Sequence, residues 1–145
     1  MNEELLSLIL LYRAGFDTAE LFEENLNRIF LENPENKDLL ELECMSFRDA
    51  VIYLSRNFDY STLNEDTLSR ALIRFLNRLR PEQDTETFAI RLGELWDVLP
   101  FHTTRKDSPF YMIYYFEDML TSGKTDLLRT CIEDLLTFYN ESNHP

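Results

Sequence analysis

The chain has 145 residues, of which 27 are acidic and 14 are basic, so its formal net charge at neutral pH is −13. A field of this sign repels nucleic acid and anionic membranes and attracts cations, so we expect a cationic protein as the partner, and neither nucleic acid nor membrane. The hydrophobic share of 44% argues against disorder, and a chain of this length buries roughly 70% of its unfolded surface without a metal or a disulfide. Because only three residues are glycine and apolar residues recur at helical spacing, we expect an all-α protein.

Two helices are predicted in the first 33 residues. The first covers about residues 3–14 and ends at Gly15. Its apolar run of eight residues is short of the roughly 20 that cross a membrane, so a buried helix is expected. Asp17 and Glu20 form a capping box for the second helix, which Asn33 ends. The inner face of this second helix consists of Phe22, Leu26, Ile29 and Phe30.

The third and fourth helices are predicted from the clearest apolar period in the chain. Asn33 is expected to cap the third helix, with Pro34 at its first position. Steps of four and three residues then predict one continuous stripe: Leu40, Cys44, Phe47, Val51, Leu54 and Phe58. After a turn over 59–64, Thr62 or Asn64 caps the fourth helix, which ends at Pro81 and turns inward Leu68, Leu72, Phe75 and Leu79.

Three further helices complete the prediction. The fifth begins at Asp84 or Thr85 and turns inward Phe88, Leu92, Leu95 and Leu99. After a polar connection over 100–107, the sixth opens at Ser108-Pro109 and closes at Ser122-Gly123. Its segment 110–116 is apolar all round, which predicts the central, most buried helix, with a strand as the weaker alternative. Thr125 caps the last, whose inner face is Leu128, Cys131, Ile132, Leu135 and Tyr139.

The connections are short and contain no glycine- or serine-rich linker. We therefore expect a single helical domain over residues 1–145, a compact bundle of about six to seven helices, with a frayed tail over 140–145.

The cysteines and the N-terminus indicate a reducing compartment. Cys44 and Cys131 lie on apolar stripes, so two buried, reduced thiols are expected. Two cysteines alone do not build a structural zinc site, and the acidic start lacks the basic residues of a secretory signal. The interpretation is a cytoplasmic protein with no metal and no other cofactor.

The acidic residues are unevenly distributed along the chain. The net charge is −8 over residues 1–50, +2 over 51–80 and −7 over 81–145. Carboxylates complement a helix dipole only in its first turn, which accounts for Glu35 and Asp38 better than for Glu41 and Glu43. The densest stretch, which is the candidate partner-binding site, consists of Glu32, Glu35, Asp38, Glu41 and Glu43.

The arginines of residues 70–80 and the histidine at position 102 are the other candidates for binding or catalysis. Arg70, Arg74 and Arg78 are four residues apart, and Arg80 follows; they could grip phosphate, but in a chain of charge −13 pairing with neighbouring carboxylates is favoured. His102 lies in the polar connection without a second histidine for an acid–base pair, and phosphate-binding and EF-hand loops are absent. We therefore expect no catalytic residue and no enzymatic activity.

Two functions remain open at this stage. The first is a bacterial immunity protein or antitoxin, whose rigid acidic surface occupies the cationic cleft of a nuclease toxin. The alternative is a helical scaffold or regulatory subunit that binds a partner through an apolar groove near Trp96, Phe101 and Phe110. Steep salt dependence of binding favours the first function, whereas salt-insensitive binding favours the second.

Overall fold

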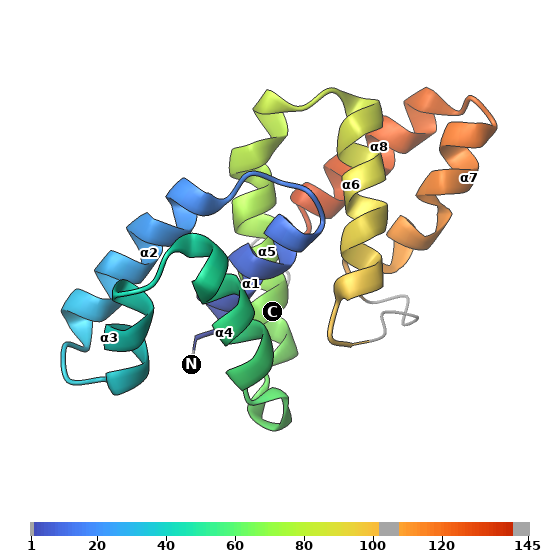
Figure 1. Cartoon of the computed structure of the whole chain (residues 1–145). Coiled ribbons are helices and arrows are strands. Elements are labelled where there is room, and N and C mark those ends of the chain that lie inside the picture. The colour runs from blue at the N-terminus through green and yellow to red at the C-terminus, as the bar shows by residue number, and fades with distance from the viewer. Residues whose placement is uncertain (1, 102–107, 141–145) are drawn as a thin grey trace.

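The computed structural model describes residues 2–101 and 108–140 (Figure 1). Within these ranges the chain forms eight α-helices, three short 3₁₀ helices and no strand. The all-α prediction is confirmed, but the predicted count of six to seven helices is too low. The α-helices are α1 (Glu3–Arg13), α2 (Ala19–Glu32), α3 (Lys37–Glu43), α4 (Phe47–Asn57), α5 (Glu65–Leu79), α6 (Thr85–Val98), α7 (Phe116–Thr121) and α8 (Thr125–Leu136). The 3₁₀ helices are η1 (Tyr60–Thr62), η2 (Arg80–Glu82) and η3 (Tyr111–Tyr115).

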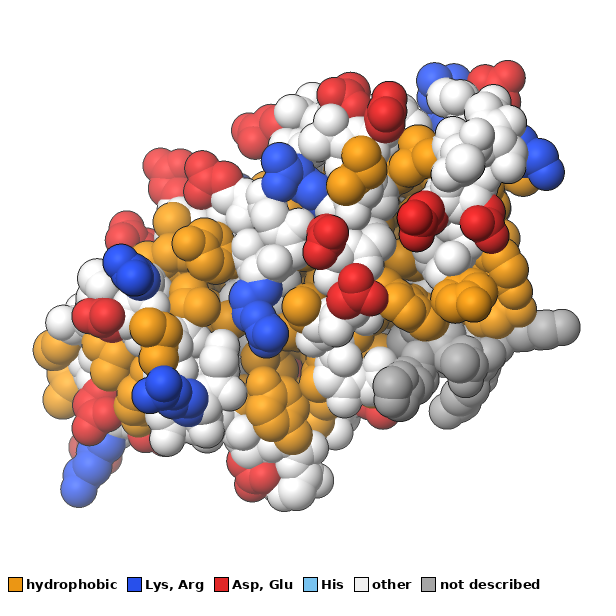
Figure 2. Space-filling view, turned by 45° about the vertical axis from the view of Figure 1, so that its right-hand side comes forward, with side chains coloured by type: hydrophobic (Ala, Val, Ile, Leu, Met, Phe, Trp, Pro, Cys, Tyr) orange, Lys and Arg blue, Asp and Glu red, His pale blue; other side chains and the backbone are white. Residues whose placement is uncertain are grey.

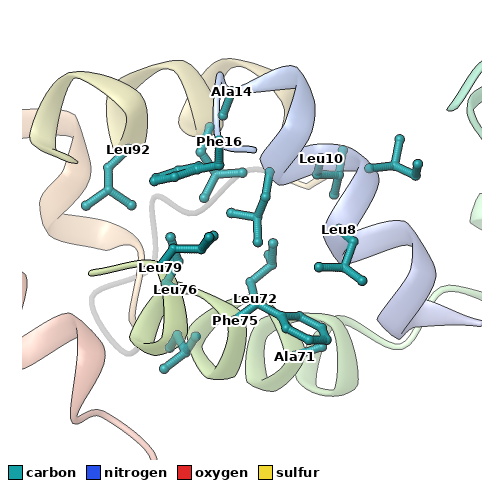
Figure 3. Packing of buried hydrophobic residues seen from close by; sticks show 14 of the residues in the cluster. Leu8, Leu10, Ala14, Phe16, Ala71, Leu72, Phe75, Leu76, Leu79 and Leu92 are labelled. Atoms are coloured by element: carbon teal, nitrogen blue, oxygen red, sulfur yellow. The ribbon is translucent and has the colours of Figure 1, made fainter. Parts of the chain in front are cut away.

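Helix α1 is the centre of the fold. Every residue from Leu5 to Leu11 is at most 1% exposed, and the hydroxyl of Ser7 is satisfied by donating to the Glu4 carbonyl. A helix that is apolar on all sides is stable only when neighbours surround it, and α1 contacts α2, α4, α5 and α6. Figure 3 shows its main contact: α1, with Leu8 among its buried side chains, lies beside a row of side chains from α5.

The segment 110–116 is not the central helix that its composition predicts. Residues 111–115 form η3, and Tyr114 is 66% exposed. The buried residues recur at every third position, namely Phe110, Ile113, Phe116 and Met119. Because a 3₁₀ helix has three residues per turn, this spacing keeps one face inward and leaves the tyrosines between at the surface.

The predicted third helix is two helices. Ser46 ends the continuity, because its hydroxyl accepts a hydrogen bond from the Asp49 amide at 3.2 Å and caps α4. Leu40 and Cys44 are exposed, so the predicted continuous stripe is wrong. The prediction that both thiols are buried is also wrong, because of the two cysteines only Cys131 is buried. The reason is packing: α3 turns its neighbouring residues Leu39 and Leu42 inward instead.

The helix caps divide between confirmed and wrong predictions. Of the two alternatives predicted for each helix, Asn64 caps α5 and Asp84 caps α6. Asn33 lies at the C-terminal end of α2, and Asn36 caps α3 in its place. Asp17 and Glu20 do not form a capping box, because the residue before α2 is Thr18, whose buried hydroxyl donates to a carbonyl of α1 at 2.9 Å.

The prediction that Thr125 caps the last helix is wrong by one residue, because Thr125 is the first residue of α8 and Lys124 precedes it. The predicted ends at Gly15 and Gly123 are confirmed, and both glycines have positive φ, of 104° and 71°. No helix of the described ranges has the length and apolar character to cross a membrane. His102 and His144 lie outside the described residues, and so does the predicted frayed tail apart from residue 140.

Candidate functional site

The acidic cluster (Glu32, Glu35, Asp38, Glu41 and Glu43) runs from the last residue of α2 through the following turn and along α3, at one end of the molecule (Figure 1). All five side chains are exposed. Asn36 fixes the start of α3, because its side chain accepts hydrogen bonds from the amides of Asp38 and Leu39 at 3.0 and 3.2 Å. Since Leu39 and Leu42 form the buried face of α3, the carboxylates of its other positions (Asp38, Glu41 and Glu43) are exposed.

Tyr53 of α4 connects two members of the cluster. Its hydroxyl donates to Oδ1 of Asp38 at 3.2 Å. Hydrogen bonding to Glu41, together with partial desolvation and the carboxylate of Asp38, raises the pKa of Tyr53 to about 12. The neutral phenol of Tyr53 is therefore a hydrogen-bond donor toward carboxylates of α3.

The other members of the cluster face elsewhere. Glu32 forms an ion pair with Arg28, one turn earlier on α2, at 3.6 Å. Glu43 and Glu23 line a depression of about 270 Å³ between α2 and the junction of α3 with α4. The structure thus connects Asp38 and Glu41 through Tyr53, while Glu32 is paired with Arg28.

The arginines of α5 are held by neighbouring groups. Arg70 pairs with Asp66 at 2.9 Å and lies over the ring of Tyr139 at 4.2 Å. Arg74 pairs with Glu4 of α1 at 3.0 Å. The predicted pairing with neighbouring carboxylates is confirmed for these two residues.

A second candidate surface lies at the opposite end of the molecule, where α6 meets η3 and α7 (Figure 1). We call it the aromatic groove. It has a volume of about 430 Å³, and its walls approach through the rings of Trp96 and Tyr114, whose centroids are 6.1 Å apart. It is lined by Ala89, Ile90, Gly93, Glu94, Trp96, Asp97, Ile113, Tyr114, Glu117 and Leu120.

Sequence reasoning located this groove only in part. Of the three residues proposed for an apolar groove, Trp96 lines it, Phe110 is fully buried in the core and Phe101 is not part of its lining. Ile90 and Tyr114 were missed, although they are 52% and 66% exposed. The available signal was the run of tyrosines over 111–115, which is richer in amphipathic rings than a buried segment requires.

The groove is lined by both apolar and acidic side chains. Glu94 and Asp97 project from α6 and Glu117 from α7, and among the described lining residues there is no lysine or arginine. Figure 2 shows hydrophobic side chains gathered on the right-hand side of the molecule, with acidic side chains beside them. On the other side of η3, a depression of about 370 Å³ includes the exposed residues Met112 and Leu127.

A metal centre finds no support within the described ranges, where no group of His, Cys, Asp and Glu side chains is arranged to hold an ion. Comparison of the chain with protein families, curated proteins and solved structures finds no match. The acidic cluster and the aromatic groove are therefore the features that bear on function.

Proposed function

We propose that this chain is an acidic protein-binding module that neutralises a basic protein partner, in the manner of an immunity protein or antitoxin directed against a nuclease. The observation that supports the proposal is the excess of exposed carboxylates on a helical body. The ion pairs among the described residues use four acids, namely Glu4, Glu32, Asp66 and Asp126. Most of the negative charge is thus left to act on a partner.

The physical basis is electrostatic steering. A nuclease binds the phosphate backbone in a cationic cleft, and a carboxylate surface of opposite sign accelerates association with that cleft. Buried aromatic or apolar anchors then set the lifetime of the complex. A helical body with a continuous core supports this role, because it presents its side chains in fixed positions.

The test starts from affinity capture with the full chain in the organism that encodes it, followed by mass spectrometry and reconstitution from two purified proteins. We expect a basic protein whose nuclease activity is blocked at equimolar ratio, and an association rate that falls about tenfold or more between about 50 and 300 mM NaCl. A partner that is neutral or acidic, or that keeps its activity in the complex, contradicts the proposal.

Charge reversal locates the surface that the partner uses. In the cluster variant, four residues become lysine: Glu35, Asp38, Glu41 and Glu43. The matched control variant reverses four exposed acids elsewhere, namely Glu82, Glu86, Glu133 and Asp134. Because both variants change the net charge equally, a larger loss of affinity in the cluster variant assigns the contact to α3. Equal losses contradict that assignment.

The alternative is a helical scaffold or regulatory subunit that binds through an apolar groove. The aromatic groove favours it, because the exposed side chains of Ile90 and Tyr114 beside a partly buried tryptophan are typical of interaction sites. This alternative predicts binding that changes little between the two salt concentrations. The same reconstituted pair distinguishes the two functions.

A further inference from the structure

We propose that the aromatic groove is the docking site for a basic amphipathic helix of the protein partner, with Gly93 as the point where that helix approaches α6. The inference rests on the proposed function, since it takes the partner to be basic. It goes further by assigning the contact to a surface remote from the acidic cluster and by naming the secondary structure that fits it.

The side chains that line the groove supply apolar contact area. Ile90 and Tyr114 stand on its two walls and are 52% and 66% exposed, so they have much surface left to bury. Trp96 adds a third large side chain in contact with Tyr114. Tryptophan and tyrosine carry much of the binding energy at protein interfaces, because they bury large areas at little entropic cost.

The rim of the groove selects the charge of the occupant. Glu94 and Asp97 lie on one wall and Glu117 on the other, and none of the three forms an ion pair with a described residue. An apolar helix flanked by lysine or arginine therefore finds a carboxylate on each side. Nucleic acid and anionic membranes are repelled by the same rim.

The dimensions of the groove favour a helix. Its lining runs along α6 from Ala89 to Asp97, and eight steps of helical rise give a length of about 12 Å. A helix of about eight residues covers this length and presents apolar anchors at the first, fourth, fifth and eighth positions. An extended segment of the same length presents only about two side chains toward the floor.

Gly93 provides the independent observation. It lies in the interior of α6, where glycine is the least favourable residue after proline. A Cβ at this position meets no atom within 4 Å, so packing among the described residues does not demand glycine. Gly93 lines the groove, and the missing side chain lets a second helix lie closer to α6.

The probe is a synthetic peptide of about 14 residues, with leucine at every third or fourth position and arginine on both sides of that stripe. The control is a peptide of identical composition with a scrambled order. We expect the amphipathic peptide to bind the full chain about tenfold or more tighter than its control in calorimetry, and to shift the amide resonances of Ala89–Asp97 and Tyr114. Equal binding of both peptides, or shifts confined to other regions, overturns the proposal.

Two variants sharpen the test. Gly93→Leu fills the floor with a good helix former, so we expect the melting temperature to be retained while the amphipathic peptide loses about tenfold or more in affinity. Reversing Glu94, Asp97 and Glu117 to lysine removes the salt dependence of peptide binding, whereas reversing Glu82, Glu86 and Glu133 preserves it in part. If Gly93→Leu binds the peptide as the parent chain does, the role of Gly93 is refuted.

The native partner separates failure of this inference from failure of the proposed function. If that partner is basic and is lost by the cluster variant but kept by Gly93→Leu, the docking inference is wrong and the proposed function stands. If the partner is not basic, the proposed function fails, whichever peptide the groove binds.

Discussion

The three glycines of the chain occupy two different kinds of position, and alanine substitution should separate them. Gly93 is in the interior of α6 with open space around its missing side chain. Gly123 follows α7 with φ of 71°, and the amides of Gly123 and Lys124 return to the carbonyls of Leu120 and Met119 at 3.2 and 2.9 Å. This pattern is a Schellman cap, which needs a left-handed residue at the position of Gly123.

The expected effects have opposite signs. Alanine is favoured over glycine by about 1 kcal/mol in a helix interior, and at Gly93 no contact opposes this gain. At Gly123 an added Cβ costs about 1–2 kcal/mol in the left-handed region. An unfolding entropy of about 2.1 cal/mol/K per residue makes 1 kcal/mol equal to about 3 °C for a chain of this length. Gly93→Ala should thus melt about 3 °C higher and Gly123→Ala about 3–6 °C lower.

Differential scanning calorimetry of the parent chain and both variants measures these shifts. The chain is otherwise unchanged, so Gly123→Ala serves as the control for the effect of alanine on the unfolded state, which both variants share. A lower melting temperature for Gly93→Ala would refute the reasoning. It would mean that the added methyl group clashes with neighbouring atoms, although none lies within 4 Å among the described residues.

Three further predictions concern individual side chains. Glu4→Gln should destabilise the chain by about 1 kcal/mol in chemical denaturation, because Glu4 pairs with arginines of both α2 and α5, whereas Asp126→Asn should change stability little, since it loses one exposed pair. Tyr53 should ionise near pH 12 in an absorbance titration; its raised pKa favours the neutral phenol in the fold, so the stability it contributes is complete below pH 10 and lost as pH rises through 12. A thiol reagent should modify Cys44 quickly and Cys131 only on unfolding, because burial raises the pKa of the Cys131 thiol.

The parts of the fold that the sequence predicts correctly are those with local chemical causes. Gly15 and Gly123 end helices because each adopts a positive φ, and Asn64 and Asp84 begin helices because their side chains accept a backbone amide. Such features depend on a few neighbouring residues. They are visible in the chain before any tertiary contact is known.

The errors arise where tertiary packing chooses between patterns. Over residues 37–57, steps of three and four fit one long stripe, yet the helix breaks at Ser46 and α3 buries Leu39 and Leu42 instead of Leu40. Over 110–119, every third residue is buried, and residues 111–115 form a 3₁₀ helix. The tyrosines between the buried positions are therefore at the surface. Since composition does not encode the rotation of a helix about its axis, the sequence located the aromatic groove only through Trp96 and missed Ile90 and Tyr114.

The two candidate surfaces also differ in how they should act on a partner's kinetics. The long-range field comes from all 27 acids, so reversing any three exposed carboxylates should slow association to a similar degree. The groove acts only at contact, so reversing Glu94, Asp97 and Glu117 should also accelerate dissociation of the partner. Reversal of Glu82, Glu86 and Glu133 is the matched control. Surface plasmon resonance measures both rates, and unchanged dissociation in the groove variant would show that the partner binds without the groove, because charge at a distance alters encounter and not residence.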